Sequence, residues 1–129
     1  MSAAGQYLLL FYRSEDEVAA LSEEERKAIV GEYFALADEL RTKGGYVTGA
    51  PLQPISTATT VRIRDDEIVM TDGPFAETKE QLGGYFLIEA GSLEEACTVA
   101  ARVPAARLGS VEVRPVVPAR TPASVEATA

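Results

Sequence analysis

Apolar residues along this chain alternate between strand-like and helix-like patterns, in the order strand-helix-strand-strand-strand-strand-helix-strand. Two continuous apolar runs, at residues 6–12 and 84–89, are typical of central strands buried on both faces. Strict alternation at residues 59–64 and 67–71, separated by Asp65-Asp66, predicts a β-hairpin. A short strand at 46–49, ended by Ala50-Pro51, and a last strand at 110–116 complete the set, and Pro115 favours an edge position for the last strand.

Both predicted helices begin at a capping box, in which a serine and a glutamate three residues later satisfy free backbone amides. Ser22 and Glu25 begin a long amphipathic helix at residues 22–43, which Gly44-Gly45 ends. Ser92 and Glu95 begin a shorter helix that ends at Pro104. The apolar stripe of the shorter helix includes Cys97, which we therefore expect to be a buried small hydrophobic residue.

This order of elements predicts an α+β protein with a ferredoxin-like sandwich, in which two helices cover one face of a mostly antiparallel sheet. We expect a single domain over residues 1–117 and a flexible C-terminal tail over 118–129, because the tail lacks a core-forming pattern. The central strands are apolar on both faces, yet helices cover only one. A second subunit is therefore expected on the other face, which makes the protein a homodimer.

Composition excludes several classes of function. The 129 residues carry a net charge of −8, which argues against nucleic-acid binding, and no apolar run is long enough to span a membrane. The single cysteine and the absence of a basic leader at the N-terminus favour the reducing cytoplasm. The chain has no histidine, which removes Ser-His-Asp and Cys-His catalysis and histidine zinc sites. We expect neither a metal nor a cofactor.

Residues 72–80 read Asp-Gly-Pro-Phe-Ala-Glu-Thr-Lys-Glu, a turn with more functional groups than chain reversal requires. This string resembles the motif that names the DGPFAETKE family of YCII-related proteins, and the similarity covers roughly residues 7–116. The resemblance implies a dimeric α+β barrel and a protein partner related to extracytoplasmic-function sigma factors. It also implies a His-Asp pair as the active site, of which this chain can supply only the aspartate.

Asp72 is the candidate catalytic residue, as a general acid or base; the alternative is an Asx-turn within its own loop. The candidate ligand-binding residues are Tyr12, Arg62, Phe75, Glu77 and Lys79. The alternatives are solvated charges for Arg62, Glu77 and Lys79 and a loop anchor for Phe75. A further hypothesis places Tyr12, Arg13 and Tyr33 near one cleft, where a tyrosine replaces the missing histidine as proton donor. Gly83-Gly84 indicates close packing or a β-bulge.

Two functions fit these observations. The first is a binding or regulatory module whose cleft accepts a small molecule or a partner segment. The alternative is an enzyme of unknown reaction that uses Asp72 as acid or base.

Overall fold

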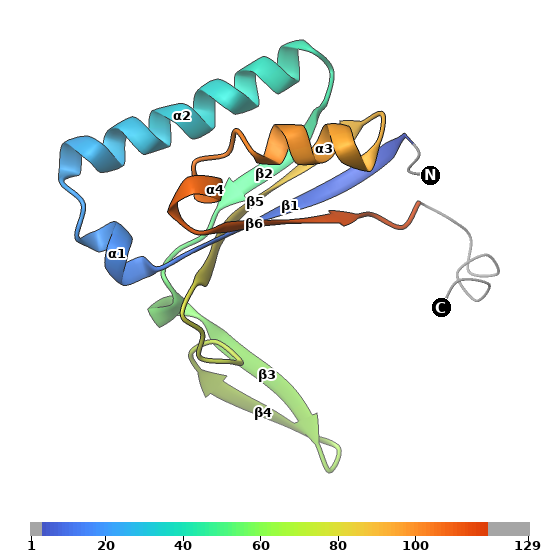
Figure 1. The fold of residues 1–129 in the computed structure, drawn as a ribbon. Coiled ribbons are helices and arrows are strands. Elements are labelled where there is room, and N and C mark those ends of the chain that lie inside the picture. Colours follow the sequence, from blue (N-terminus) through green and yellow to red (C-terminus); the bar gives the residue numbers. More distant parts are fainter. Residues whose placement is uncertain (1–3, 119–129) are drawn as a thin grey trace.

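The two long apolar runs lie side by side at the centre of a sheet in the structure, a computed structural model in which residues 4–118 are described. The sheet has four antiparallel strands in the order β2-β5-β1-β6 (Figure 1). These are β1 (Gly5–Arg13), β2 (Tyr46–Pro51), β5 (Gln81–Ala90) and β6 (Ser110–Pro115). The α+β class is confirmed, and this strand order is consistent with a ferredoxin-like fold. The edge position of β6, predicted from Pro115, is confirmed as well.

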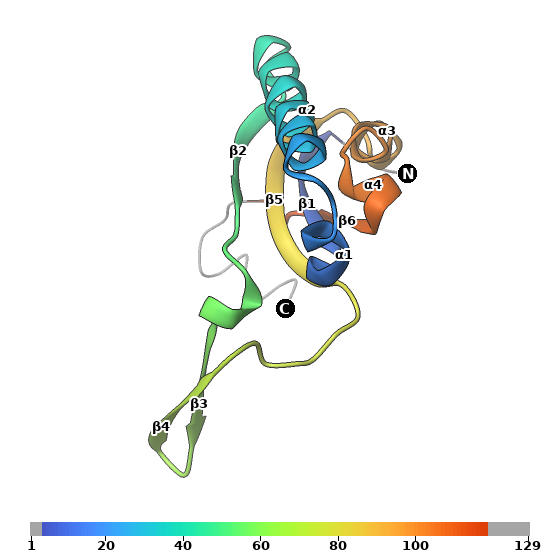
Figure 2. The ribbon, with the colours of Figure 1, turned by 90° about the vertical axis from the view of Figure 1, so that its left-hand side faces the viewer.

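Helices α2 (Glu23–Thr42) and α3 (Leu93–Ala100) lie on one side of this sheet (Figures 1 and 2). The capping box that begins α2 is complete: the Glu25 amide donates to Ser22 Oγ, and the Ser22 amide donates to Glu25 Oε1, both at 3.0 Å. Gly44 follows the helix end with φ of +82°, the left-handed conformation that glycine adopts without strain. Both boundaries therefore confirm the prediction from sequence.

The core lies between these helices and one face of the sheet, and it follows from the alternation of residues along the strands. On β1, Tyr7, Leu9 and Phe11 point toward the helices and are buried. Their neighbours on β5 and the helix residues that meet them are Phe86, Ile88, Leu36, Ala37, Leu40, Ala96, Ala100 and Val103. The intervening residues Leu8 and Leu10 point to the opposite face, which no helix covers.

The structure contains short helices that the sequence analysis did not predict. The segment after β1 forms α1 (Glu15–Ala19), because Ser14 Oγ accepts from the Glu17 amide and acidic residues fill the first turn. The shorter helix was predicted to end at Pro104 but ends at Ala100, with Ala101 as its C-cap. Pro104 instead begins α4 (Ala105–Leu108), since proline is tolerated at a helix start. A 3-10 turn, η1 (Ile55–Thr57), follows β2.

Strand β2 continues through Ala50-Pro51, where the sequence analysis expected it to stop. Pro51 pairs with Gly84 on β5, and β2 is an edge strand with no neighbour on its other side. An edge strand tolerates proline because no further strand needs its amide. The boundary prediction was therefore wrong by two residues for a reason that lies in the sheet order.

The predicted hairpin forms as β3 (Thr59–Arg64) and β4 (Glu67–Asp72), and its turn residues Asp65 and Asp66 have φ of 51° and 63°. The hairpin is a separate two-stranded sheet that projects away from the main sheet (Figure 2). We call residues 59–72 the arm. Cross-strand pairing places four apolar side chains on one of its faces, all between 59% and 70% exposed: Val61, Ile63, Ile68 and Met70. Residues 59–72 therefore carry an apolar strip that nothing in the described chain covers.

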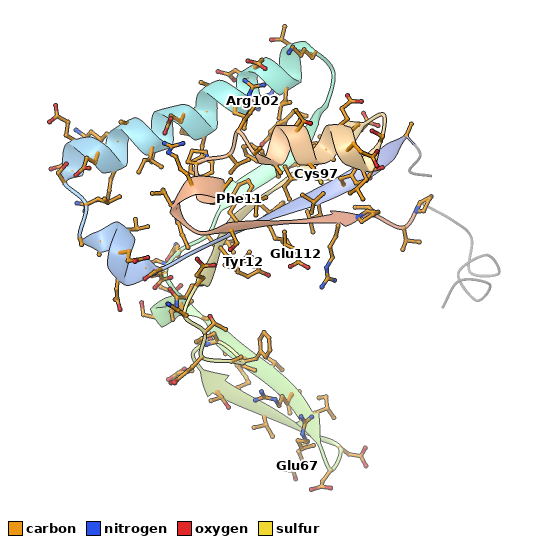
Figure 3. All side chains as sticks on the ribbon, in the orientation of Figure 1. Phe11, Tyr12, Glu67, Cys97, Arg102 and Glu112 are labelled. Carbon is orange, nitrogen blue, oxygen red and sulfur yellow. The ribbon has the colours of Figure 1, made fainter. Side chains whose placement is uncertain are left out.

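Cys97 is exposed, and the expectation that it is buried was wrong (Figure 3). Helix α3 buries Ala96 and Ala100, which lie four residues apart on one face. Cys97 lies one residue beyond Ala96, about 100° further around the helix, and so points to solvent.

An ion pair joins α2 to the segment that follows α3. Arg102 donates to Glu39 through both terminal nitrogens, with Nη2 at 2.8 Å from Oε1 (Figure 3 labels Arg102). Hydrogen bonds from Arg102 and then from Lys43 lower the pKa of Glu39 to about 2. Because this pKa is depressed on folding, the pair's contribution is present above the ordinary value of 4.5 and is lost as pH falls toward about 2. The pair is exposed, so salt weakens it.

The tail predicted for residues 118–129 lies outside the described residues, apart from Pro118. In the part of the chain that is described, no helix is both long and apolar enough to cross a bilayer.

Candidate ligand-binding site

A cavity of about 220 Å³ lies between α2 and the sheet, over the ends of β1, β2 and β5. Helix α2 contributes Val30, Tyr33, Phe34, Ala37 and Arg41 to its lining. Val30 and Phe34 are 51% and 66% exposed, so they form the rim of the cavity, whereas Ala37 lies in the core beneath. The cavity exists because a small residue, Ala37, faces the sheet at the point where larger residues of α2 turn outward.

Aromatic rings form the inner wall of the cavity. Phe86 packs against Phe11, with ring centroids 5.0 Å apart and planes at 80°, and against Tyr46 at 5.4 Å. Tyr33 from α2 lies 5.4 Å from Phe11. Tilted and edge-to-face contacts of this kind are the favoured arrangement of aromatic pairs. Rings from α2, β1, β2 and β5 therefore enclose an apolar space.

A β-bulge shapes the floor of the cavity. The pairing of β1 with β5 shifts register between Phe11 and Tyr12, so that Gly83 has no partner on β1. A Cβ atom on Gly83 would lie 3.1 Å from Arg13 Nε, and one on Gly84 would lie 3.0 Å from the Ala50 carbonyl oxygen. The two glycines therefore allow the Arg13 guanidinium to lie against the sheet, and the bulge predicted at Gly83-Gly84 is confirmed.

Two arginines line the cavity, and they differ in their partners. Arg41 donates to Asp38 at 2.7 Å, and its guanidinium lies 4.6 Å from the centre of the Tyr46 ring. Arg13 forms no ion pair with any carboxylate among residues 4–118. Arg13 is thus the cation that remains available to a bound group.

The Tyr33 hydroxyl is the other polar group of interest in the cavity. It is inaccessible to solvent and makes no hydrogen bond of normal geometry within the described chain, although Arg13 and the Ala105 backbone lie near its oxygen as donors. Burial raises the pKa of Tyr33 above its ordinary value of 10, and the nearby positive charge of Arg13 opposes this shift without cancelling it. Tyr33 is therefore a neutral hydrogen-bond donor at physiological pH.

The polar chemistry of the cavity is mostly that of hydrogen-bond donors. Its lining contains no aspartate, glutamate or cysteine, and the chain has no histidine. Across residues 4–118, no three Asp, Glu or Cys side chains come together as a metal site requires. The side chains of the cavity can donate hydrogen bonds to an acceptor on a ligand. None of them is a deprotonated group that could act as a general base near neutral pH.

The structure places the residues predicted from the motif away from this cavity. Asp72 is the last residue of β4, opposite Thr59, and is exposed. No hydrogen bond to its carboxylate is found among the described residues, so the Asx-turn alternative is not seen either. Phe75 is 81% exposed, and Glu77 and Lys79 are exposed as well. Catalytic or ligand-binding roles for these residues stay predictions.

The hydrogen bonds of the motif hold its own loop in place. Ser110 Oγ donates to Glu80 Oε1 at 2.9 Å, which ties the loop to the start of β6. Thr78 Oγ1 donates to the Glu80 carbonyl at 2.6 Å, and Gln81 Nε2 donates to the Thr78 carbonyl at 2.6 Å. The end of the motif thus secures the beginning of β5, the strand that carries Gly83 and Phe86 into the cavity.

Of the three residues considered for one cleft, the structure brings two together. Arg13 and Tyr33 both line the cavity. Tyr12 points to the opposite face of the sheet, as Phe11 and Tyr12 show in Figure 3, because successive strand residues alternate sides. Arg62 is half-buried on β3, opposite Val69 in the arm. Its role in ligand binding and that of Tyr12 stay predictions.

The sequence analysis did not assign Phe11, Tyr46 and Phe86 to a site. One pattern points toward the cavity: alternation from Tyr7 through Leu9 and Phe11 puts Arg13 on the core side of β1. A cation such as Arg13, at the end of a buried apolar face, needs an anionic partner, and no nearby pattern in the sequence indicates which residue that is.

The model of the YCII-related domain family matches residues 6–120. The chain belongs to this family. An uncharacterised protein of Rhizobium meliloti (strain 1021) is 39% identical to this YCII-related protein over 111 residues, which cover 84% of this chain and 90% of the relative. The resemblance drawn from residues 72–80 is confirmed. Since the relative's name gives no activity, the function of this YCII-related protein is argued from its own cavity.

Proposed function

We propose that this YCII-related protein is a binding module for a small molecule, which occupies the cavity beneath α2. The observation that carries the proposal is the combination of aromatic walls with the unpaired Arg13 and Tyr33 hydroxyl. Concave apolar sites with a few convergent polar groups are the usual form of small-molecule sites. The lack of an ionised base in the lining supports binding rather than catalysis.

Filling the cavity is expected to abolish binding. Ala37→Leu adds three heavy atoms to the buried wall and should remove the thermal shifts that cavity ligands give in a fragment screen, whereas Ala28→Leu on the exposed face of α2 should leave them unchanged. Val30→Trp, at the rim, provides a second test in case Ala37→Leu is destabilised. Ligands that bind both cavity variants as well as they bind the wild type would refute the proposal.

The alternative function, an enzyme that uses Asp72 as acid or base, is tested in the same screen. Asp72→Asn keeps the shape of the side chain and removes its charge and proton. An unchanged ligand profile would exclude the charged Asp72 from the binding site. The sigma-factor-related partner follows from the family resemblance alone, and titration of a purified sigma factor into the protein by calorimetry would test it. Absence of heat at micromolar concentration would count against that partner.

We also propose that the protein is a homodimer of the α+β barrel type. Two uncovered apolar surfaces support this: the strip on residues 59–72, and the sheet face opposite the helices. On that face Leu10 lies beside Tyr85, and Leu8 beside Leu87, in the pairing of β1 with β5. A lone two-stranded hairpin is marginally stable in water, so a partner surface that covers the arm accounts for its regular pairing.

A charge placed in the arm should dissociate the dimer. Ile68→Lys puts an ammonium group in the middle of the apolar strip, and a buried unpaired charge typically weakens an interface by several kcal/mol. Light scattering should therefore report a dimer for the wild type and for Ala28→Lys, on the helix side, and a monomer for Ile68→Lys at the same micromolar concentration. A monomeric wild type would contradict the proposed homodimer, and an Ile68→Lys variant that stays dimeric would contradict the role of the arm in its interface.

A further inference from the structure

We propose that the cavity selects a small monoanion, a single planar ring bearing one carboxylate, with the carboxylate held by Arg13 and Tyr33. The inference rests on the proposed binding function and adds the chemical class of the ligand. It follows from three independent features of the cavity: its size, its charge and its unpaired donor.

The size of the cavity limits the ligand to about one ring. Its volume is about 220 Å³, and an engineered apolar cavity of about 150 Å³ is enough to bind benzene. The remaining space accommodates one substituent of a few atoms. The enclosing rings of Phe11, Tyr33, Tyr46 and Phe86 offer edges and faces to a planar guest.

The charge of the cavity selects an anion. Arg41 already pairs with Asp38, while Arg13 has no carboxylate partner among residues 4–118, and no acidic residue lines the cavity. This arginine is notable in a chain with a net charge of −8, in which carboxylates outnumber cations. A guanidinium presents paired N–H donors that match the two oxygens of a carboxylate. Gly83 leaves the space that the guanidinium occupies, so the cation is positioned before any ligand arrives.

The Tyr33 hydroxyl supplies a second donor to the same group. It is buried without an acceptor, and such a group is destabilising until it is paired. Arg13 and Tyr33 both line this cavity, so the two donors are available to the same bound group. A carboxylate between them would accept from both and satisfy the buried hydroxyl.

Three compounds of the same shape and different charge test this inference on the full chain: benzoate, benzamide and benzamidine. Calorimetry at pH 7 should show benzoate binding about tenfold or more tightly than neutral benzamide, since hydrogen bonds to charged groups are the stronger ones. Cationic benzamidine should not bind detectably. Arg13→Gln should reduce the affinity for benzoate by about tenfold or more and leave benzamide nearly unchanged, which also shows that the cavity remains formed. Tyr33→Phe should weaken benzoate binding by a smaller factor.

Arg64→Gln on β3 is the matched control, because it removes an exposed arginine that does not line the cavity, and it should bind all three compounds as the wild type does. Equal affinities for benzoate and benzamide, or an Arg13→Gln variant that still prefers benzoate, would overturn the anion inference and leave the binding function standing. Failure of all three compounds, with other ligands found in the fragment screen, would also overturn only this inference. Failure of every compound in both experiments would overturn the binding function as well.

Discussion

Replacing Leu9 by alanine is expected to lower the free energy of unfolding by about 3 kcal/mol, the middle of the range for leucine truncation in a packed core. Leu9 is 0% exposed at the centre of β1. Its partners in the sheet are Phe86 on β5 and Val113 on β6, and the helices cover it from above. The surrounding strands are held by hydrogen bonds on both sides of β1, so they cannot collapse into the space that the side chain leaves.

Leu52→Ala is the matched control for this loss, because it deletes the same atoms from a residue that is 45% exposed. Its cost should stay below about 1 kcal/mol, as for most surface substitutions. Urea unfolding of both variants, at one protein concentration so that any association affects them equally, gives the comparison. Equal destabilisation by the two substitutions would mean that Leu9 is not the packed centre of the core.

Gly109→Ala is expected to destabilise the protein by about 2 kcal/mol or more, the scale of overpacking in a closed site. A Cβ atom on Gly109 would lie 2.2 Å from the Tyr12 carbonyl oxygen and 2.9 Å from Arg13 Cα. Both atoms belong to the backbone of β1, so no side-chain rotation relieves the clash. Gly109 has φ of −165°, outside the left-handed region, and the expected effect comes from the clash with the backbone of β1.

The same substitution should also weaken the binding of benzoate, because the backbone that must move carries Arg13. Gly31→Ala in α2 is the control: nothing lies within 4 Å of its Cβ position, and alanine there should stabilise the helix by about 0.5–1 kcal/mol. Thermal melts and benzoate titrations on both variants separate the effects. A Gly109→Ala variant as stable as the wild type would show that β1 and the α4–β6 connection are not in close contact.

Local sequence patterns predicted most of the fold because the relevant interactions are local. The Ser22 and Ser92 caps fix helix starts through hydrogen bonds to residues three positions away. Alternation in β1 and β5 fixes which side chains are buried. The position of the arm was not predicted, since pairing between β3 and β4 is decided within the hairpin and carries no information about the direction in which the hairpin leaves the sheet.

The candidate site was predicted less well, because it is assembled from residues far apart in sequence. Arg13 and Tyr33 were both considered, but nothing near either residue in the chain indicates that Phe86 and Gly83 complete the same cavity. The nine residues 72–80 attracted attention through their density of charged groups. In the structure, Glu80 and Thr78 use their polar groups to hold the loop, and Asp72 and Phe75 remain exposed.

The arm consists of two strands whose hydrogen bonds lie within the hairpin and whose apolar strip touches nothing else in the described chain. The arm therefore contributes less than the main sheet to the cooperativity of unfolding. Regions with few buried contacts open at a low free energy, independently of global unfolding. The described chain thus contains two units of unequal local stability. The sandwich opens only when the whole domain unfolds, whereas the hairpin can open without moving any residue that lines the ligand cavity.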